Sequence, residues 1–167
     1  MSDDQRTLAE KLIRNFNDVP LERFVRAPLY DSMCAWIGAG MAAEKLGVSV
    51  DTVAPGMLSC PYHLHHAQEE MFVVIAGSGT LRVAGAMLPI RTGDVIVIPA
   101  GPDYPHQIIN TSDAPLQYLS ISTRETPEIC EYPDSGKFGA FTSTAGGRAF
   151  DGRQRVANNL DYWDGEP

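Results

Sequence analysis

Four histidines are the residues of this 167-residue sequence that are best suited to chemistry. His63, His65 and His66 lie within four consecutive positions, and His106 follows about 40 positions later. In an extended strand, side chains two residues apart project from the same face, with Cα atoms about 6.6–7 Å apart. The imidazoles of His63 and His65 can therefore reach one metal ion, although surface pairs of this kind also occur without a metal.

Two carboxylates follow the paired histidines. Glu69 and Glu70 come after a short turn and open the next predicted strand. Three imidazoles and one carboxylate suit a borderline divalent ion such as Fe, Mn, Ni, Co or Zn. The alternative is that both glutamates belong to a solvent-exposed turn and have no role in metal binding.

The elements that must position these residues change character along the chain. Leu8, Leu12, Ile13 and Phe16 fall on one face of a helix predicted over residues 3–18. A proline at position 20 ends that pattern, and the next 25 or so residues are expected to be irregular or to form short elements. From about residue 46 the pattern favours strands.

Short strands at regular spacing, with turns rich in glycine and proline, are typical of a sandwich, jelly roll or small barrel. Eight are predicted: Val48–Ala54, Tyr62–His65, Glu70–Ala76, Thr80–Val83, Leu88–Arg91, Asp94–Ile98, His106–Asn110 and Leu116–Thr123. The run Val95–Ile98 is apolar at every position, which predicts a strand buried on both faces. Residues 125–167 hold two possible strands and a polar tail.

Glycines at fixed distances from the histidines complete a pattern. Gly56 precedes His63 and His65, Glu70 follows after four residues, and Gly77 follows after six more. This order resembles the first motif of the cupin superfamily: Gly, five residues, His-x-His, three or four residues, Glu, six residues, Gly. The leading glycine lies one residue further upstream than the motif asks.

The segment around His106 is similar to the second cupin motif. Gly93 is followed by five residues, then Pro99-Ala100-Gly101, His106 and, after three residues, Asn110. Four residues rather than two separate Gly101 from His106, which lengthens one loop. Asn110 is expected to be structural. The two motifs match in order over roughly half of the chain.

The resemblance implies an all-β fold, the cupin double-stranded β-helix or jelly-roll barrel. One domain is expected over residues 1–167. It would comprise the N-terminal helix over 3–18, a barrel core over 46–124 and a C-terminal extension over 125–167.

The resemblance also implies that His63, His65, Glu70 and His106 bind a divalent transition metal, which would be Fe, Mn, Ni, Co or Zn. Glu70 is preferred to Glu69 because it keeps the six-residue step to the following glycine.

Five neighbouring residues are assigned by parity and position. Phe72 and Ile108 share the strand parity of the two predicted ligands nearest to them, and they are expected to line an apolar substrate pocket. Tyr104, in the lengthened loop, is a candidate hydroxyl donor at the pocket mouth or an aromatic packed on the rim. His66 is expected in a loop or at the surface, and Cys60 is expected to point away from the metal into the core.

Three functions stay open. The first is a metal-dependent enzyme of unknown reaction, for example a dioxygenase, acting on a small organic acid or phenolic compound. The second is a sugar or sugar-phosphate isomerase, which needs basic side chains at the mouth. The available ones are scattered along the sequence: Arg82, Arg91, Arg124, Lys137 and Arg148. The third is a small-ligand-binding protein without turnover.

Composition limits the partners. Lys plus Arg number 13 and Asp plus Glu number 21, for a net charge of −8, and there is no basic run. Such a chain is poorly suited to nucleic acid, and no apolar stretch reaches the roughly 20 residues of a membrane span. A small-molecule ligand is the expected partner.

Cysteines and aromatic residues at the end of the chain give two further expectations. Cys34, Cys60 and Cys130 are too few and too scattered for a disulfide framework, and no export signal is visible, so a cytoplasmic location is expected. Tyr162 and Trp163 lie in a polar tail, where they are expected to dock on the barrel or on a partner subunit. A homodimer is the expected assembly.

Overall fold

The computed structural model describes residues 2–144 and 147–166 and shows one short helix followed by β-strands. The elements are α1 (Asp3–Leu12), β1 (Glu22–Arg26), β2 (Tyr30–Trp36), β3 (Leu46–Val53), β4 (Leu64–His65), β5 (Glu70–Ala76), β6 (Ser78–Val83), β7 (Ala86–Arg91), β8 (Val95–Ile98), β9 (His106–Ile109), β10 (Leu116–Thr123), β11 (Glu128–Tyr132), β12 (Lys137–Thr144), β13 (Gly147–Arg155) and η1 (Val156–Asn158).

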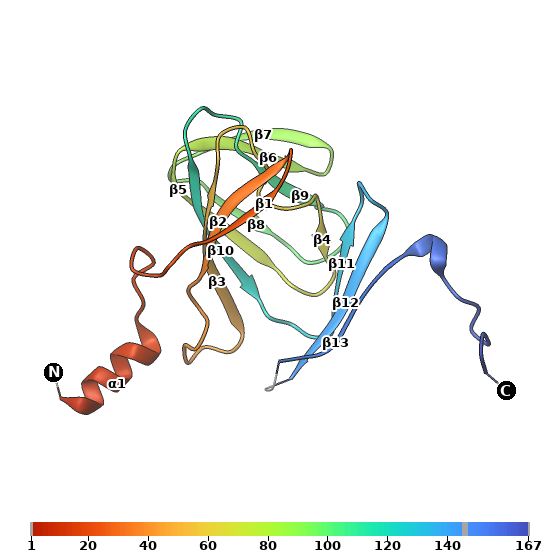
Figure 1. Cartoon of the computed structure of the whole chain (residues 1–167), viewed down its shortest axis with the longest axis horizontal. Helices are drawn as coiled ribbons and strands as arrows, with labels where there is room; N and C mark the ends of the chain where they lie inside the picture. The colour runs from red at the N-terminus through yellow and green to blue at the C-terminus, as the bar shows by residue number, and fades with distance from the viewer. Residues whose placement is uncertain (1, 145–146, 167) are drawn as a thin grey trace.

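The strands form two walls that face each other across one apolar core (Figure 1). One wall is a six-stranded sheet in the order β1-β2-β3-β10-β5-β8, and the other contains the sheets β7-β6-β9 and β13-β12-β11-β4. An antiparallel bridge between His63 and His106 joins these two smaller sheets. The predicted all-β jelly roll is confirmed.

The main core fills the space between the walls because alternate residues of each strand point inward. Its buried members come from both walls: Val53, Phe72, Val74, Leu81, Val83, Ile90, Ile98, Ile108, Leu116 and Tyr118. A second cluster lies on the outer face of the six-stranded sheet, where Phe16 and Val19 pack against Ala35, Ile37 and Val50.

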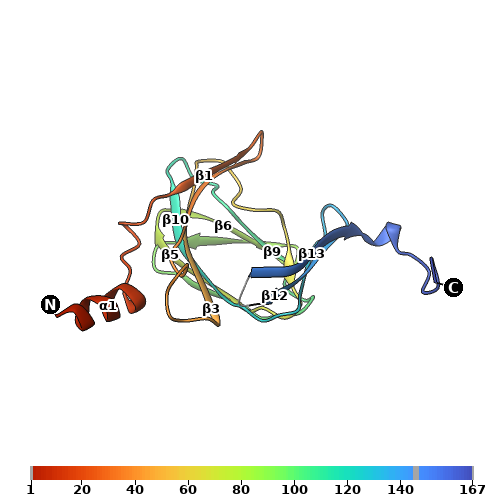
Figure 2. The same cartoon turned by 60° about the horizontal axis from the view of Figure 1, so that its bottom comes forward.

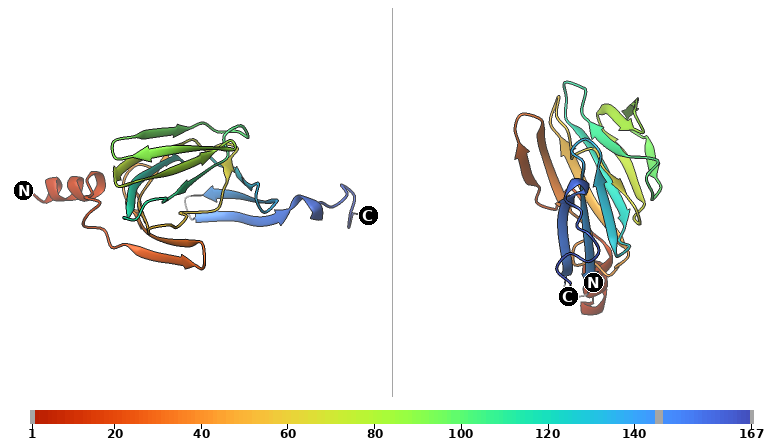
Figure 3. Two further views of the ribbon diagram at one scale, coloured as in Figure 1. Left: turned by 90° about the horizontal axis from the view of Figure 1, so that it is seen from above. Right: turned by 90° about the vertical axis from the view of Figure 1, so that its right-hand side faces the viewer.

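The N-terminal helix differs from the prediction. It ends at Leu12 rather than at residue 18, and the chain turns extended at Ile13. Phe16 packs on the sheet from irregular backbone, whereas Leu8 and Leu12 are 57% and 60% exposed. Figure 3 shows α1 projecting away from the barrel. Apolar spacing alone did not separate the helix from the packed segment after it.

Other boundaries were predicted with mixed success. Glu70–Ala76 and Leu116–Thr123 match β5 and β10. Strands β1 and β2 were not predicted, and the C-terminal extension forms three strands rather than two, lying at the side of the barrel (Figure 2). β8 is an edge strand whose Val95 and Val97 are 58% and 67% exposed, so the prediction of burial on both faces was wrong.

The turn at Gly77 needs a residue without a side chain. Its φ is +86°, and a Cβ atom would lie 2.5 Å from the backbone oxygen of Pro115. Both conditions favour glycine. This close approach holds β5 against the turn that leads into β10. Among the described residues, no helix is long and apolar enough to cross a membrane.

Candidate metal centre

Two of the predicted ligands are fixed opposite each other by the backbone. The amide of His63 donates to the carbonyl of His106 at 3.0 Å, and the amide of His106 donates to the carbonyl of His63 at 2.7 Å. Two residues that exchange both hydrogen bonds lie directly opposite each other, with Cα atoms about 5.5 Å apart. The imidazoles of two residues 43 positions apart thus meet, with ring centroids 4.6 Å apart.

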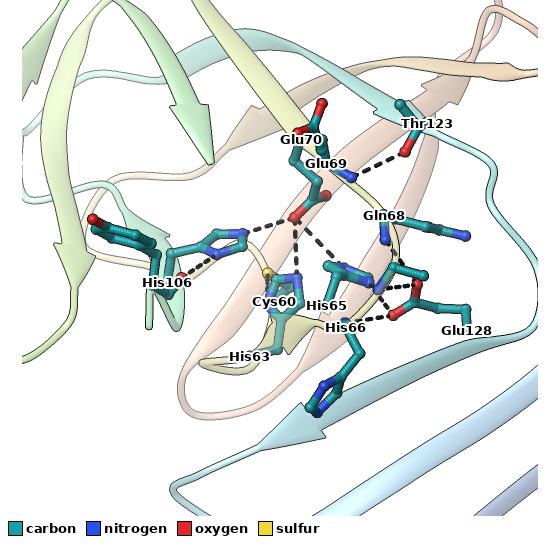
Figure 4. Close-up of polar contacts among 12 residues, drawn as sticks. Cys60, His63, His65, His66, Gln68, Glu69, Glu70, His106, Thr123 and Glu128 are labelled. Carbon is teal, nitrogen blue, oxygen red and sulfur yellow. Dashed lines mark hydrogen bonds and ion pairs between the residues drawn. The ribbon is translucent and has the colours of Figure 1, made fainter. Parts of the chain in front are cut away.

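Glu70 reaches this pair from the other wall, at the first residue of β5. Its Oε2 lies 2.8 Å from His106 Nε2, 3.5 Å from His65 Nε2 and 3.7 Å from His63 Nε2. Figure 4 shows the carboxylate pointing towards all three imidazoles. The ligand atoms of His63, Glu70 and His106 all lie within 4.8 Å of one another, while His65 is outside that closest group.

The other ring nitrogens fix the tautomers of two histidines. His63 Nδ1 lies 2.9 Å from the carbonyl of Pro61, and His106 Nδ1 lies 3.1 Å from the carbonyl of Tyr104. A carbonyl oxygen only accepts, so each Nδ1 carries a proton, and in the neutral imidazole each Nε2 presents a lone pair. His106 Nε2 and Glu70 Oε2 are buried polar atoms without a hydrogen-bond partner.

Buried lone pairs that face each other repel, and leaving such atoms unpaired costs free energy. A cation between them would satisfy every donor atom at once. The residues therefore fit a divalent transition metal, in both donor type and orientation.

His65 lies against a carboxylate that the sequence did not identify. Its Nδ1 lies 3.3 Å from Oε1 of Glu128, a residue of β11 with no exposed surface. Glu128 also accepts backbone amides from His66 at 3.0 Å, Ala67 at 3.1 Å and Gln68 at 2.9 Å. Carboxylates behind histidine ligands commonly fix the ring and its tautomer. Glu128 lies 58 positions beyond Glu70, so only the fold reveals the contact.

Electrostatics keep the central carboxylate ionised. Burial alone would raise the pKa of Glu70, but the imidazoles of His106 and His63 outweigh burial and hold that pKa well below its usual range. Burial lowers the pKa of His65, which keeps its imidazole neutral and available as a donor. At His63, burial alone would lower the pKa, but Cys60 and Glu70 outweigh burial and hold that pKa well above its usual value, so a cation at this centre would compete with a bound proton.

A cavity of about 290 Å³, which we call the metal cavity, opens onto these residues. Phe72 and Ile108 line it, where both were expected, and Phe72 packs between the rings of His106 and Tyr118 at 5.7 and 5.8 Å. The hydroxyl of Ser120 lies on the wall among the apolar residues. The metal cavity is thus only partly apolar, and this departs from the expected lining.

A second hollow of about 260 Å³, the outer cavity, adjoins the first. Glu70 and His65 line both, and Arg153 of β13 lines only the outer one. Among the described residues, Arg153 is the single Lys or Arg that lines either cavity, and it pairs with Asp151 at 2.9 Å.

The structure also places three other residues that the sequence singled out: Tyr104, His66 and Asn110. The side chain of Tyr104 is 47% exposed and lines neither cavity, and its backbone carbonyl is the group that meets His106. His66 is exposed and pairs with Glu131 at 2.6 Å, as expected for a surface residue. Asn110 is fully buried and donates to two backbone carbonyls, which is a structural role.

The prediction for Cys60 was wrong. Its Sγ lies 3.8 Å from His63 Nδ1, and it lines the metal cavity rather than the core. Parity failed because residues 60–63 form a bend and a bridge rather than a regular strand.

Comparison with known proteins agrees with this geometry. The model of the cupin domain family matches residues 49–122. Auxin-binding protein 1 of Arabidopsis thaliana is 32% identical over 133 residues, which are 74% of this chain and 64% of that protein. An uncharacterised protein of Methanocaldococcus jannaschii is 33% identical over 73 residues, which are 41% of this chain and 57% of that protein. The matches span less than two thirds of the length of either relative.

The fold has solved counterparts as well. The crystal structure of a putative sugar phosphate isomerase from Acidithiobacillus ferrooxidans superposes with a TM-score of 0.79 at 24% identity, covering 92% of this chain and 97% of that one. Both histidine motifs lie within residues 49–122, the part of the chain that the family model matches. The chain belongs to the cupin superfamily.

Proposed function

We propose that this protein is a metal-dependent enzyme that acts on a small molecule. His63, His65, Glu70 and His106 would hold one divalent ion in the metal cavity. The observation that carries the proposal is the set of inward-facing donors: Nε2 lone pairs fixed by carbonyls behind the rings, aimed at a buried carboxylate oxygen that has no hydrogen-bond partner.

A divalent ion bound there supplies a Lewis acid that polarises a carbonyl or carboxylate group. The chain supplies the rest of the site. Phe72 and Ile108 contact the apolar part of the ligand, and the hydroxyl of Ser120 is available to its polar part. The volume of the metal cavity lies at the small end of ligand pockets, which favours a compact organic acid or carbonyl compound.

Metal content tests the proposal. Protein purified without chelators should contain close to one transition-metal ion per chain by elemental analysis. His106→Ala and Glu70→Gln should each lower that content several-fold, because each removes a donor atom from the cluster. The chain offers matched controls in His66→Ala and Glu69→Gln, whose side chains are exposed. Wild-type content near zero, or equal losses in variants and controls, would contradict the proposal.

An isomerase is the second candidate. Four serines line the two cavities: Ser49, Ser59, Ser120 and Ser122. Hydroxyl groups on an inner wall suit a hydroxylated ligand, and Arg153 in the outer cavity suits an anionic group on it. Among the described side chains, Arg82, Arg91, Arg124 and Lys137 line neither cavity. Arg82 pairs with Asp134 at 2.7 Å, and Lys137 lies over the ring of Tyr132. The side chain of Arg148 lies outside the described part of the structure.

We also propose that the protein is a homodimer. The projecting helix α1 buries none of its residues, and a ten-residue helix is marginal in water on its own. Leu160, Tyr162 and Trp163 are also mostly exposed at the other end of the molecule. A second copy that covers these apolar side chains would account for both ends. We place the protein in the cytoplasm, where its three free cysteines would stay reduced.

A further inference from the structure

A second carboxyl group faces the metal cavity. Asp51 lies on β3, on the same inward face as Ser49 and Val53, and both Asp51 and Ser49 line the cavity together with Glu70. The strands of Asp51 and Glu70 belong to the same sheet, with β10 between them. One wall of the cavity thus carries two carboxyl groups, of which only Glu70 meets the histidines.

The surroundings of Asp51 contain hydroxyl and thiol groups. Ser49 Oγ donates to Asp51 Oδ2 at 2.7 Å. Cys34 on β2 and Tyr118 on β10 are its direct cross-strand neighbours, and both line the cavity. Among the described residues, no Lys or Arg lines the metal cavity. A largely buried carboxylate without a cationic partner is costly, so its presence calls for a specific reason.

Among the titratable groups around Asp51, Asp51 itself is the one best able to exchange a proton, because its neighbours Cys34 and Tyr118 hold theirs tightly. Burial raises the pKa of Asp51, hydrogen bonds from Ser49 and Cys34 lower it, and the charge of Glu70 raises it. Burial and repulsion by Asp51 raise the pKa of the Cys34 thiol to about 12. Burial also raises the pKa of the Tyr118 hydroxyl well above its usual value. Cys34 and Tyr118 therefore stay protonated, while Asp51 can cycle between its two forms.

We propose that Asp51 is the acid–base residue of the metal cavity, and this rests on the proposed metal-dependent function. Its carboxylate takes a proton from a carbon next to a carbonyl group of the ligand. The C–H electron pair becomes a carbon–carbon double bond, and the carbonyl π pair moves to oxygen. Asp51 then returns the proton to the same carbon while the electron pair on oxygen re-forms the carbonyl group. The step is redox-neutral and needs no co-reactant.

This assignment narrows the substrate class to small carbonyl compounds that carry hydrogen on the adjacent carbon, such as keto acids and hydroxyketones. In these compounds the carbonyl oxygen can bind the metal, and the adjacent carbon carries the proton that Asp51 removes. Ser49 would hold the carboxylate in place through its hydrogen bond, and Phe72 would pack on the ligand carbon chain.

Solvent exchange of pyruvate tests the assignment, because pyruvate has a carbonyl next to a methyl group. In D₂O, protein loaded with one Zn²⁺ per chain should exchange the methyl protons faster than the same protein stripped by a chelator, as followed by proton NMR. Asp51→Asn should lower the rate at least tenfold while Zn²⁺ content and pyruvate affinity stay unchanged. The matched control is Glu69→Gln, which removes an exposed carboxylate next to the site and should keep the wild-type rate.

A second readout needs no metal. In metal-free protein labelled with ¹³C at aspartate carboxyl carbons, the resonance that Asp51→Asn removes should titrate above the ordinary aspartate range. The exchange rate of wild-type protein should rise with pH through that midpoint, and the variant should lack the rise. An ordinary midpoint, equal rates in Asp51→Asn and wild type, or no exchange by fully loaded wild type would each overturn the assignment. Failure to retain Zn²⁺ would instead overturn the metal proposal beneath it.

Discussion

At the scale of single residues, this protein places atoms that would repel each other in one buried space. Glu70 Oε2 and His106 Nε2 lie 2.8 Å apart, and both are buried polar atoms without a hydrogen-bond partner. Asp51, on the same wall of the metal cavity, is a carboxyl group without a cationic neighbour among the described residues, since hydroxyl and thiol groups surround it. Such unfavourable placements are typical of functional sites rather than of packing.

Asp51 also gives a prediction for stability. Its pKa is higher in the folded chain than in the unfolded one, because burial disfavours the charged form. Between the two values the folded state binds more protons, so the free energy of unfolding falls as pH rises through that window. Asp51→Asn removes this penalty. Denaturant titrations should find the variant more stable than wild type at pH 7, with the gap closing towards pH 4.

The comparison isolates one carboxyl group, because every other titratable residue is common to both proteins. Asp31→Asn is a control of opposite sign. The pKa of Asp31 is lowered by its hydrogen bond to Arg23, so this variant should not gain stability at neutral pH. A gap for Asp51→Asn that is constant with pH would contradict the prediction.

At the scale of elements, the ligand loop is held from behind by the C-terminal extension. Cys130 of β11 pairs with His65 of β4, and Glu128 binds the three successive amides that follow. Loops carry functional groups only where a rigid scaffold fixes them. The extension, which follows the family domain in sequence, is therefore part of the support of the metal centre.

Glu128→Gln should weaken that support. An amide offers one acceptor oxygen in place of two, so at least one buried backbone amide would lose its partner, at a cost of about 1–3 kcal/mol. Urea unfolding of the metal-free protein should show this loss, and metal content should fall because His65 is no longer oriented. Glu131→Gln, on the same strand but with an exposed side chain, should match wild type in both measurements. Equal stability of the two variants would contradict the assigned role.

At the scale of the whole molecule, the barrel is well packed while both ends extend from it with apolar side chains exposed (Figures 1 and 3). The helix is capped in full, by a capping box between Ser2 and Gln5, yet it packs on little of the chain besides the loop at Ala42, which donates to Lys11. A helix whose ends are both capped and whose apolar side chains are exposed is suited to contact with another molecule.

Light scattering during gel filtration tests the proposed dimer. Wild-type protein should elute at twice the chain mass, and the double variant Leu8→Asp, Leu12→Asp should elute as a monomer, because two charges would enter the apolar contact. Thr7→Asp adds a charge to the same helix outside this pair and should remain dimeric. Wild-type protein that is monomeric at micromolar concentration would contradict the proposal.

The sequence by itself predicted the class of fold and the residues of the cluster, through two motifs whose spacing resembles that of the cupin superfamily. Side-chain parity put Glu70 rather than Glu69 on the inward face, and glycine was needed where Gly77 approaches Pro115. Local spacing failed where tertiary contacts override it. Local spacing predicted a helix that includes Phe16, but this residue packs on the sheet from irregular backbone. Local spacing also predicted that Cys60 points away from the site, but the backbone bends there and brings its sulfur to His63.

Only the tertiary structure decided which distant groups complete the site. Glu128 and Asp51 are ordinary acidic residues in sequence, and nothing near either of them signals a role. Glu128 meets His65 because β11 pairs with the short strand β4, and Asp51 reaches the cavity because β3 and β5 flank β10 in one sheet. Contacts of this kind depend on strand order, which is set by the burial of the whole core and not by any neighbouring residue.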